Sequence, residues 1–174
     1  PIRGNKELDP EGQFPLPEDA RTIFHVMQDA GYKTSAFGKW GLGYIGTSGD
    51  PRNQGCKTFF GYNCQLLAHS YYPDHLWDND QRVELKDNVV DVQYGTGTYS
   101  QDLIHSKALD YLDNIKEDEP FFMWYPTILP HAELIVPEDS IIKKFRGMYP
   151  EKAYKGTEPG NPAFRKGGYC TQIY

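Results

Sequence analysis

The sequence lacks any long hydrophobic run. A helix that spans a bilayer needs about 20 consecutive apolar residues, and no stretch among the 174 residues approaches that length. The first residues also lack the charged segment followed by an apolar segment that defines a secretory leader. We therefore expect no membrane span within these residues.

An excess of positive charge is lacking as well. The chain has 18 lysines and arginines against 24 aspartates and glutamates, which gives a formal net charge of -6. Proteins that bind nucleic acid without regard to its sequence hold the phosphates with clustered lysines and arginines. We therefore expect no nucleic-acid partner.

Cysteine is scarce. The chain has 3 cysteines, Cys56, Cys64 and Cys170, and no C-x-x-C spacing. An odd number without that spacing excludes a zinc knuckle and a complete disulfide framework. Each cysteine is expected to be a buried or loop thiol, and a disulfide between Cys56 and Cys64 stays open as an alternative.

Helical periodicity is present near the start of the chain. We predict a helix that begins at residues 16–19, where Pro17 suits the first turn and acidic residues favour the positive end of the helix dipole. The apolar residues that recur at helical spacing are Ala20, Ile23, Phe24, Met27 and Ala30. Gly31 is predicted to end the helix, and residues 34–37 to form a short strand. This order of helix, turn and strand is typical of α/β domains.

A second helix is predicted over residues 99–116. Thr98 and Gln101 have the spacing of a capping box. The expected buried stripe consists of Ile104, Ala108, Tyr111, Leu112 and Ile115. Residues 121–125 are then apolar throughout, as expected for a strand covered on both faces of a parallel sheet. We therefore predict an α/β fold with a mostly parallel sheet flanked by helices.

The stretch between the two units is predicted to be a long loop excursion. Residues 44–98 are rich in Gly, Asn, Asp and Tyr and have weak periodicity. Within them, residues 83–85 and 89–92 have the pattern of two paired short strands. After Pro130 the chain is loop-like, with a short helix predicted near residues 139–145.

Two predicted strands are followed by a titratable side chain. Lys39 lies between Gly38 and Trp40, and His131 follows the apolar strand by a few residues. The carboxyl ends of parallel strands form the ligand sites of such sheets. A lysine there can offer an ammonium group and a histidine a hydrogen bond or proton, which suits an oxyanion ester. A solvated loop lysine and a structural histidine are the common alternatives.

The remaining polar clusters are less specific. His69 and His75 flank an aromatic-rich stretch, residues 70–73, which we expect to be an exposed loop; ring stacking against a sugar is the alternative. His25 and His105 fall within the predicted helices. The acidic residues at 78–80 lack the pattern of an EF-hand loop and are expected to form a turn.

Residues 31–43, GYKTSAFGKWGLG, resemble the second signature of the type I sulfatases, G-Y-x-T-x-x-x-G-K-W-H-L-G. Other parts fit in the same order. Residues 2–5 are similar to the stretch that follows the nucleophile motif of the family, and residues 16–31 are similar to its L-P-containing helix. Residues 55–62 resemble its G-F-D-x-F-F-G-Y segment, and residues 121–131 resemble its P-F-F-L-Y-x-x-x-x-x-P-H segment. The resemblance covers residues 1–135 and implies part of an alkaline-phosphatase-like domain.

The resemblance implies roles for three residues. In such enzymes the lysine that matches Lys39 contacts the sulfate, and the histidine that matches His131 acts near the leaving oxygen. Charge grows on the bridging oxygen as the S–O bond breaks, so an ammonium group and an imidazole stabilise it. Gly41 stands where the family usually has a histidine, and His69 is a candidate substrate-binding residue.

Two features of the family are missing from the sequence. The C/S-x-P-S-R motif that yields the formylglycine nucleophile does not occur, and the aspartate pairs that hold the calcium ion are not identifiable. We therefore expect residues 1–174 to be an internal part of a sulfatase catalytic domain, with the nucleophile and the Ca²⁺ ligands outside it. Alone, this stretch is predicted to be inactive, because a lysine and a histidine do not replace a nucleophile and a metal.

The expected substrate is a sulfated carbohydrate or an aryl sulfate, and the resemblance implies a periplasmic or secreted location. Two alternatives remain. A phosphoesterase or phosphodiesterase of the same superfamily would share the architecture. A non-catalytic module could instead bind sulfated glycans, using its aromatic residues, which make up 14% of the chain, for stacking on sugar rings.

Overall fold

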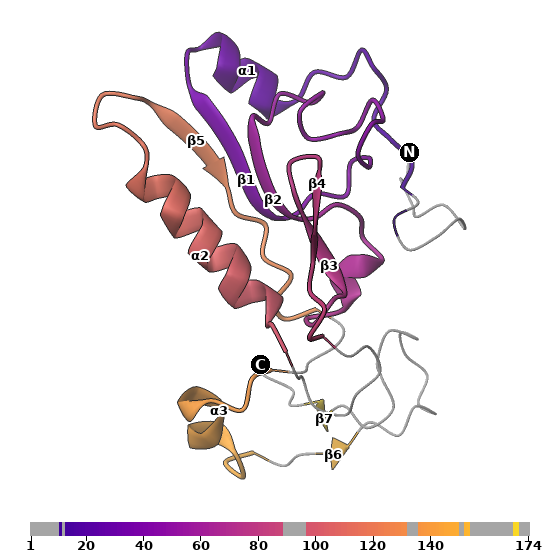
Figure 1. Ribbon diagram of the computed structural model, residues 1–174, viewed down its shortest axis with the longest axis vertical. Helices are drawn as coiled ribbons and strands as arrows, with labels where there is room; N and C mark the ends of the chain where they lie inside the picture. Colours follow the sequence, from indigo (N-terminus) through magenta and orange to yellow (C-terminus); the bar gives the residue numbers. More distant parts are fainter. Residues whose placement is uncertain are drawn as a thin grey trace.

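The computed structural model describes residue 11, residues 13–88, 97–131 and 136–149, and two short strands, β6 (Lys152–Ala153) and β7 (Tyr169–Cys170). A five-stranded sheet in the order β4-β3-β2-β1-β5 forms the centre (Figure 1). Its strands are β1 (Lys33–Lys39), β2 (Thr58–Tyr62), β3 (His75–Asp78), β4 (Gln81–Glu84) and β5 (Phe121–Trp124). The predicted α/β fold is confirmed. The pairs that β1 makes with β2 and β5 are parallel, whereas β3 joins β2 and β4 in antiparallel pairs.

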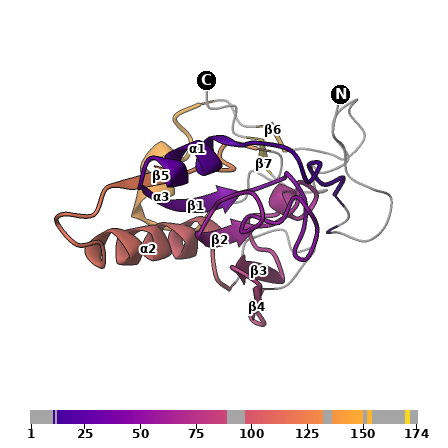
Figure 2. The ribbon, with the colours of Figure 1, turned by 90° about the horizontal axis from the view of Figure 1, so that it is seen from above.

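Two helices cover opposite faces of this sheet (Figure 2). They are α1 (Ile23–Asp29) and α2 (Ser100–Asp113). Successive residues of a strand point to opposite faces, so Ala36 of β1 belongs to the core under α1 and Phe37 to the core under α2. The apolar residues of the central strands are therefore buried on both faces.

Helix α1 begins later than predicted. It starts at Ile23, and the prediction of a start at residues 16–19 is wrong. The N–H of Ala20 donates to the carbonyl of Pro17 at 3.1 Å, which closes a turn before the helix. The N–H of Thr22, the N-cap residue, donates to Nδ1 of His25 at 3.1 Å, so a histidine takes the role that Glu or Gln has in a capping box. Gly31, with φ of 86°, ends the helix as predicted.

Helix α2 confirms the second predicted helix, but its cap differs. Tyr99 is the N-cap residue, and the predicted capping box between Thr98 and Gln101 is wrong. The N–H of Thr98 donates instead to the side chain of Asn88 at 2.6 Å. The buried stripe holds Ser100, Gln101, Ile104 and Ala108, whereas Leu112 is 38% exposed.

Strand β5 is more exposed than predicted. Phe121 is 43% exposed and Trp124 is 40% exposed. In the sheet of the described residues, β5 pairs with β1 on one side and forms an edge on the other. A strand in that position is covered less than a central strand, so the prediction of burial on both faces is wrong for these residues.

The first strand of the predicted hairpin, at residues 83–85, falls partly in β4. Val83 lies in β4, which pairs with β3 across the turn at Asn79 and Asp80. The acidic stretch is therefore a turn, as predicted, and Asn79 adopts φ of 53° there. The second predicted strand, at residues 89–92, lies outside the described residues.

Three further expectations have clear outcomes. Cys56 and Cys64 are buried and form no disulfide with each other, so the alternative of a disulfide between them is wrong. Helix α3 (Ser140–Phe145) confirms the short predicted helix, and Asp139 caps it by accepting from the N–H groups of residues 141 and 142. None of the helices in the described ranges is long and apolar enough to cross a membrane.

The aromatic stretch at residues 70–73 was expected to be an exposed loop, and this is wrong. Tyr71 is 1% exposed, and Tyr72 is buried beside it. Both rings pack against Tyr99, at centroid distances of 6.2 and 5.5 Å. His75 is also buried and begins β3. These residues belong to the core between the sheet and the start of α2.

Candidate functional site

The site forms where β1 and β5 end side by side. The two strands are parallel, so Lys39 at the end of β1 and the segment 125–131 after β5 lie at the same edge of the sheet. The N–H of Lys39 donates to the carbonyl of Pro126 at 2.9 Å, which ties the two ends together. The sequence thus predicted correctly that these two strand ends meet.

Glycine allows the two strand ends to approach this closely. Gly38 has φ of 132°, and a Cβ at this position would lie 2.2 Å from the carbonyl oxygen of Pro126. Gly61 of β2 is paired with Gly38, and its Cβ would lie 2.0 Å from the carbonyl oxygen of Gly38. A side chain at either position would push the strands apart and displace Lys39.

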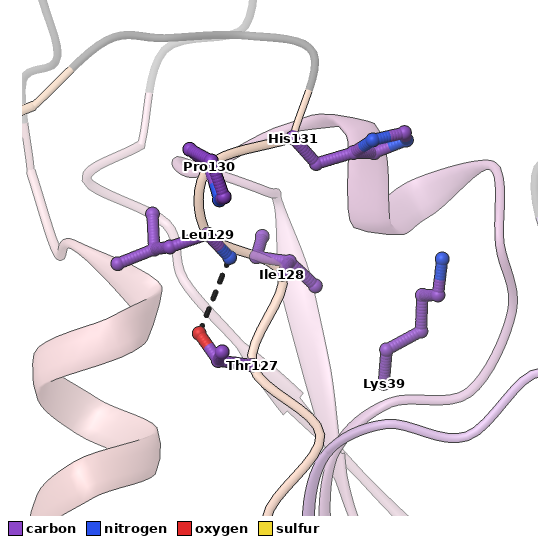
Figure 3. A pocket seen from close by; sticks show the side chains of 6 residues that line it. All are labelled: Lys39, Thr127, Ile128, Leu129, Pro130 and His131. Atoms are coloured by element: carbon purple, nitrogen blue, oxygen red, sulfur yellow. Dashed lines mark hydrogen bonds between the residues drawn. The ribbon is translucent and has the colours of Figure 1, made fainter. Parts of the chain in front are cut away.

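A pocket of about 280 Å³ opens at this point (Figure 3). Its lining residues are Lys39, Thr127, Ile128, Leu129, Pro130 and His131. In Figure 3, the amino group of Lys39 points toward the side of the pocket where the ring of His131 lies. Ile128 is buried, and Oγ1 of Thr127 accepts from the N–H of Leu129 at 3.2 Å, so the segment itself is anchored.

His131 is held from a third part of the chain. The ring of His69 stacks on the ring of His131, with centroids 4.8 Å apart and an interplanar angle of 28°. The hydroxyl of Tyr71 donates to the carbonyl of His131 at 2.8 Å. His69 ends the short 3-10 helix η1 (Leu67–His69), so η1 and the residues after it contact the segment that lines the pocket.

Burial and the charge of Lys39 both lower the pKa values of the two histidines. His131 is exposed overall, but partial burial of its ring lowers its pKa below the usual value, and the positive charge of Lys39 lowers it further. Burial also lowers the pKa of His69, and positive charge on His131 and Lys39 adds to this effect. Both imidazoles are therefore neutral near pH 7, and a neutral imidazole can donate one hydrogen bond and accept another.

The structure brings together the residues that the sequence singled out. Lys39 and His131 line one pocket, and His69 lies against His131. His69 is absent from the lining of that pocket, so its direct contact with a substrate stays a prediction, as do the chemical roles of the other two. The sequence analysis missed Tyr71, because an aromatic residue in a polar stretch gave no sign of burial.

Gly41 leaves no side chain at the position after Trp40. It has φ of 76°, and a Cβ there would lie 3.3 Å from Cγ of Gln65. Trp40 itself is buried and donates from its indole N–H to the carbonyl of Gly49 at 2.7 Å. The chain after Lys39 is thus fixed by packing and hydrogen bonding, while position 41 adds no titratable group.

A second polar cluster surrounds His75 on β3. Nε2 of His75 is 2.6 Å from Oε1 of Glu11, and Nδ1 of His75 is 2.6 Å from Oδ1 of Asp74. The indole N–H of Trp77 donates to the same oxygen of Glu11 at 2.6 Å. Burial lowers the pKa of His75, but the two carboxylates outweigh this effect and raise it above its usual value. This histidine therefore serves as a cationic link between β3 and Glu11.

The described ranges contain no metal centre. No group of three or more His, Cys, Asp or Glu side chains within them could hold a metal ion. The residues of the pocket do not fit the calcium ion that the resemblance implies, because Lys39 is a cation and His131 is the other titratable residue of the lining. No role in the reaction is therefore derived for a metal.

Comparison with known proteins supports one family. The family model described as Sulfatase matches residues 4–163. An N-acetylglucosamine-6-O-sulfatase of Bacteroides thetaiotaomicron is 29% identical over 113 residues, which are 65% of this chain and 17% of that protein. An arylsulfatase of Klebsiella aerogenes is 26% identical over 153 residues, which are 80% of this chain and 30% of that protein. The chain therefore spans less than a third of these relatives.

Solved structures agree with this result. A protein in complex with its substrate D-glucosamine-2-N,6-O-disulfate has a TM-score of 0.56 at 26% identity, over 80% of this chain and 24% of that one. A second protein, in complex with k-i-k-neocarrahexaose, has a TM-score of 0.59 at 20% identity, over 79% of this chain and 32% of that one. The second likeness concerns the fold alone.

Proposed function

Because this chain belongs to the sulfatase family, we propose that it is part of the catalytic domain of a sulfuric ester hydrolase. The observation that carries the proposal is the shared pocket of Lys39 and His131. Its volume of about 280 Å³ is at the low end for ligand pockets, so it suits a sulfate group with part of its leaving group.

Lys39 is proposed to bind the sulfate group of the ester. An ammonium group attracts the negative charge of a sulfate ester, and the attraction grows as charge develops on the oxygens during S–O cleavage. The strand and the contact with Pro126 hold the backbone of Lys39 in place before a substrate arrives. The side chain of Lys39 is therefore anchored at its base, beside the pocket.

His131 is proposed to act on the bridging oxygen. In the empty pocket its imidazole is neutral, since burial and Lys39 lower its pKa. A bound sulfate ester brings negative charge that offsets Lys39 and favours protonation of His131. The imidazolium can then donate its proton to the leaving oxygen as the S–O bond breaks.

The nucleophile is proposed to come from outside residues 1–174. The chain holds no C/S-x-P-S-R motif, and we propose that a formylglycine nucleophile and calcium ligands belong to other segments of the full-length protein. An isolated protein of residues 1–174 should bind a sulfate ester without turning it over.

The proposed substrate class is a sulfated sugar, with aryl sulfates as surrogates. One relative is named an N-acetylglucosamine-6-O-sulfatase, and one structural neighbour was solved with a sulfated glucosamine. Both are similar at low identity, so the sugar and the position of its sulfate are open. An exported location is also proposed, on the resemblance alone.

The test is release of sulfate by the protein expressed from its complete reading frame. We expect it to release sulfate from glucosamine 6-sulfate or from 4-nitrophenyl sulfate, and more slowly to release phosphate from 4-nitrophenyl phosphate. Faster release of phosphate would overturn the proposal in favour of a phosphoesterase. Binding of sulfated glycan without release from any ester would instead support the non-catalytic module.

A further inference from the structure

We propose that His69 and Tyr71 are positioning residues that hold His131 in its place at the pocket. This inference deepens the proposed function and rests on the role of His131 in it. Neither residue is part of the pocket lining. Both act on His131, one on its ring and the other on its backbone.

The segment that carries these two residues is itself firmly anchored. The hydroxyl of Tyr62, on β2, donates to the carbonyl of Ser70 at 2.6 Å. The N–H of Ser100, at the start of α2, donates to the carbonyl of Tyr71 at 3.0 Å. Ala68 is buried within η1. The position of the segment is therefore set by the sheet on one side and by α2 on the other.

Tyr71 holds the backbone of His131 in place. Its side chain is buried, and its ring packs edge to face against Tyr99. Its hydroxyl reaches the carbonyl of His131, which lies 60 residues further along the chain. A buried phenol has little rotational freedom. Its hydrogen bond therefore fixes the position of the bonded backbone more firmly than a solvated donor would.

His69 holds the ring of His131 in place. Residue 131 is exposed, so few neighbours restrain its ring. Among the described residues, the stacked ring of His69 is the aromatic contact that sets the plane of the His131 imidazole. A proton donor must point at the oxygen it serves, and a displacement of about 1 Å can cost about 100-fold in rate.

The stacked pair also disfavours protonation of both imidazoles at once. The charged groups that act on His69 are His131 and Lys39, and the one that acts on His131 is Lys39. Two imidazoles in contact do not both become cations readily, because like charges repel. His131 lines the pocket and His69 does not, so an anion bound in the pocket favours protonation of His131, and His69 then stays neutral.

The experiment uses the full-length protein with His69→Ala and His69→Phe. We expect His69→Ala to lower kcat about tenfold or more with a nearly unchanged KM. His69→Phe keeps an aromatic ring for stacking, so it should restore most of the loss. The matched control is His105→Ala, which removes an exposed imidazole from α2 that lies edge-on to Tyr125, outside the pocket lining, and should leave both constants nearly unchanged.

The backbone contact is tested with Tyr71→Phe, which removes only the hydroxyl. We expect about a 2- to 10-fold loss of kcat, the range that one neutral hydrogen bond provides. Tyr99→Phe is the control, because Tyr99 packs on the ring of Tyr71 and belongs to the same aromatic group. It should change kcat by less than Tyr71→Phe.

A spectroscopic readout separates positioning from general loss of structure. The ring protons of His131 feel the ring current of His69, so His69→Ala should move their NMR resonances while His69→Phe and His105→Ala keep them close to the wild-type positions. Unchanged His131 resonances in His69→Ala would overturn the inference, as would equal kcat losses in His69→Ala and His69→Phe. If the wild-type protein released no sulfate, the proposed function would fail, but the resonances would still decide whether His69 orients His131.

Discussion

His131 and His75 have opposite electrostatic surroundings. His131 lies in an open pocket beside Lys39, and burial together with that cation lowers its pKa. His75 is buried on β3 between two carboxylates, and these raise its pKa against the effect of burial. The surroundings thus favour the neutral form of one imidazole at the edge of the sheet and the charged form of the other within it.

The difference separates a reactive histidine from a structural one. His75 has carboxylate neighbours for both of its ring nitrogens, Glu11 and Asp74, so no nitrogen is left for a substrate. The ring of His131 has its face against His69 and lines a pocket with space for a ligand. A neutral ring that gains a proton when an anion arrives can give that proton away, whereas a ring locked between carboxylates cannot.

Removal of the pocket histidine should have the largest effect. His131→Ala is expected to lower kcat/KM of the full-length protein about 100- to 10,000-fold, which is the contribution of a positioned proton donor. Its stability should change little, since residue 131 is exposed. Steady-state release of sulfate from 4-nitrophenyl sulfate is the measurement. A variant with more than half of the wild-type kcat/KM would rule out the proposed role.

Removal of the neighbouring cation should have the next largest effect. Lys39→Ala is expected to lower kcat/KM about 100- to 1,000-fold, because one fixed electrostatic contact to the developing charge is lost. The same variant should raise the pKa of His131, since Lys39 lowers it. An NMR titration of His131 checks this shift. A pKa that stays unchanged in Lys39→Ala would show that the two side chains do not share a pocket.

The close approach behind the pocket can be broken without touching either side chain. Gly38→Ala places a Cβ 2.2 Å from the carbonyl oxygen of Pro126 at φ of 132°, so we expect a loss of about 3 kcal/mol in stability. Gly31→Ala is the control: its φ is also positive, at 86°, but its Cβ would meet nothing within 4 Å. It should cost only about 1 kcal/mol. Thermal unfolding of both variants decides this, and equal losses would contradict the role of the close approach.

The structural histidine should affect stability and leave catalysis alone. His75→Gln is expected to cost about 1–2 kcal/mol, a modest value because Asp74 is largely exposed. The folded pKa of His75 is raised above 6.5, so the contribution is fully present below about pH 6.5 and is lost as the pH rises through the folded pKa. Burial raises the pKa of Glu11, but hydrogen bonds from His75 and Trp77 outweigh this effect and lower it. The ion pair between His75 and Glu11 therefore persists as the pH falls, down to the lowered pKa of Glu11.

Unfolding of wild type and His75→Gln should therefore differ most near pH 5.5 and least near pH 9. His105→Gln serves as the control, since His105 is exposed on α2 and should show no such pattern. A difference that grew with rising pH would contradict the cationic link.

Much of the fold and the site could be predicted from local patterns. The apolar period around Phe24, the glycine at position 31 and the apolar strand after Pro120 are local signals, and they gave both helix–strand units. Lys39 and His131 each follow such a strand, and the parallel pairing of β1 with β5 brings them to one edge. The meeting of Lys39 and His131 could be predicted because both residues follow strands, and the end of a strand can be recognised from the local sequence.

Other features depend on contacts between residues far apart in the sequence and have no local sequence signal. Tyr71 is buried because α2 returns against it, and its bond to His131 joins residues 60 positions apart. Strand β4 pairs with β3, whose residues carried no strand signal in the sequence. The exposure of Trp124 follows from the position of β5 at the edge of the described sheet, which strand composition does not reveal.

The central claim is that Lys39 and His131 form one pocket for a tetrahedral oxyanion. Titration of the full-length protein with inorganic sulfate, followed through the NMR resonances of its histidines, tests it most directly. We predict that sulfate raises the pKa of His131 and leaves the pKa of His75 unchanged, and that Lys39→Ala abolishes this response. If sulfate left His131 unaffected, or shifted His75 equally, the account would be contradicted.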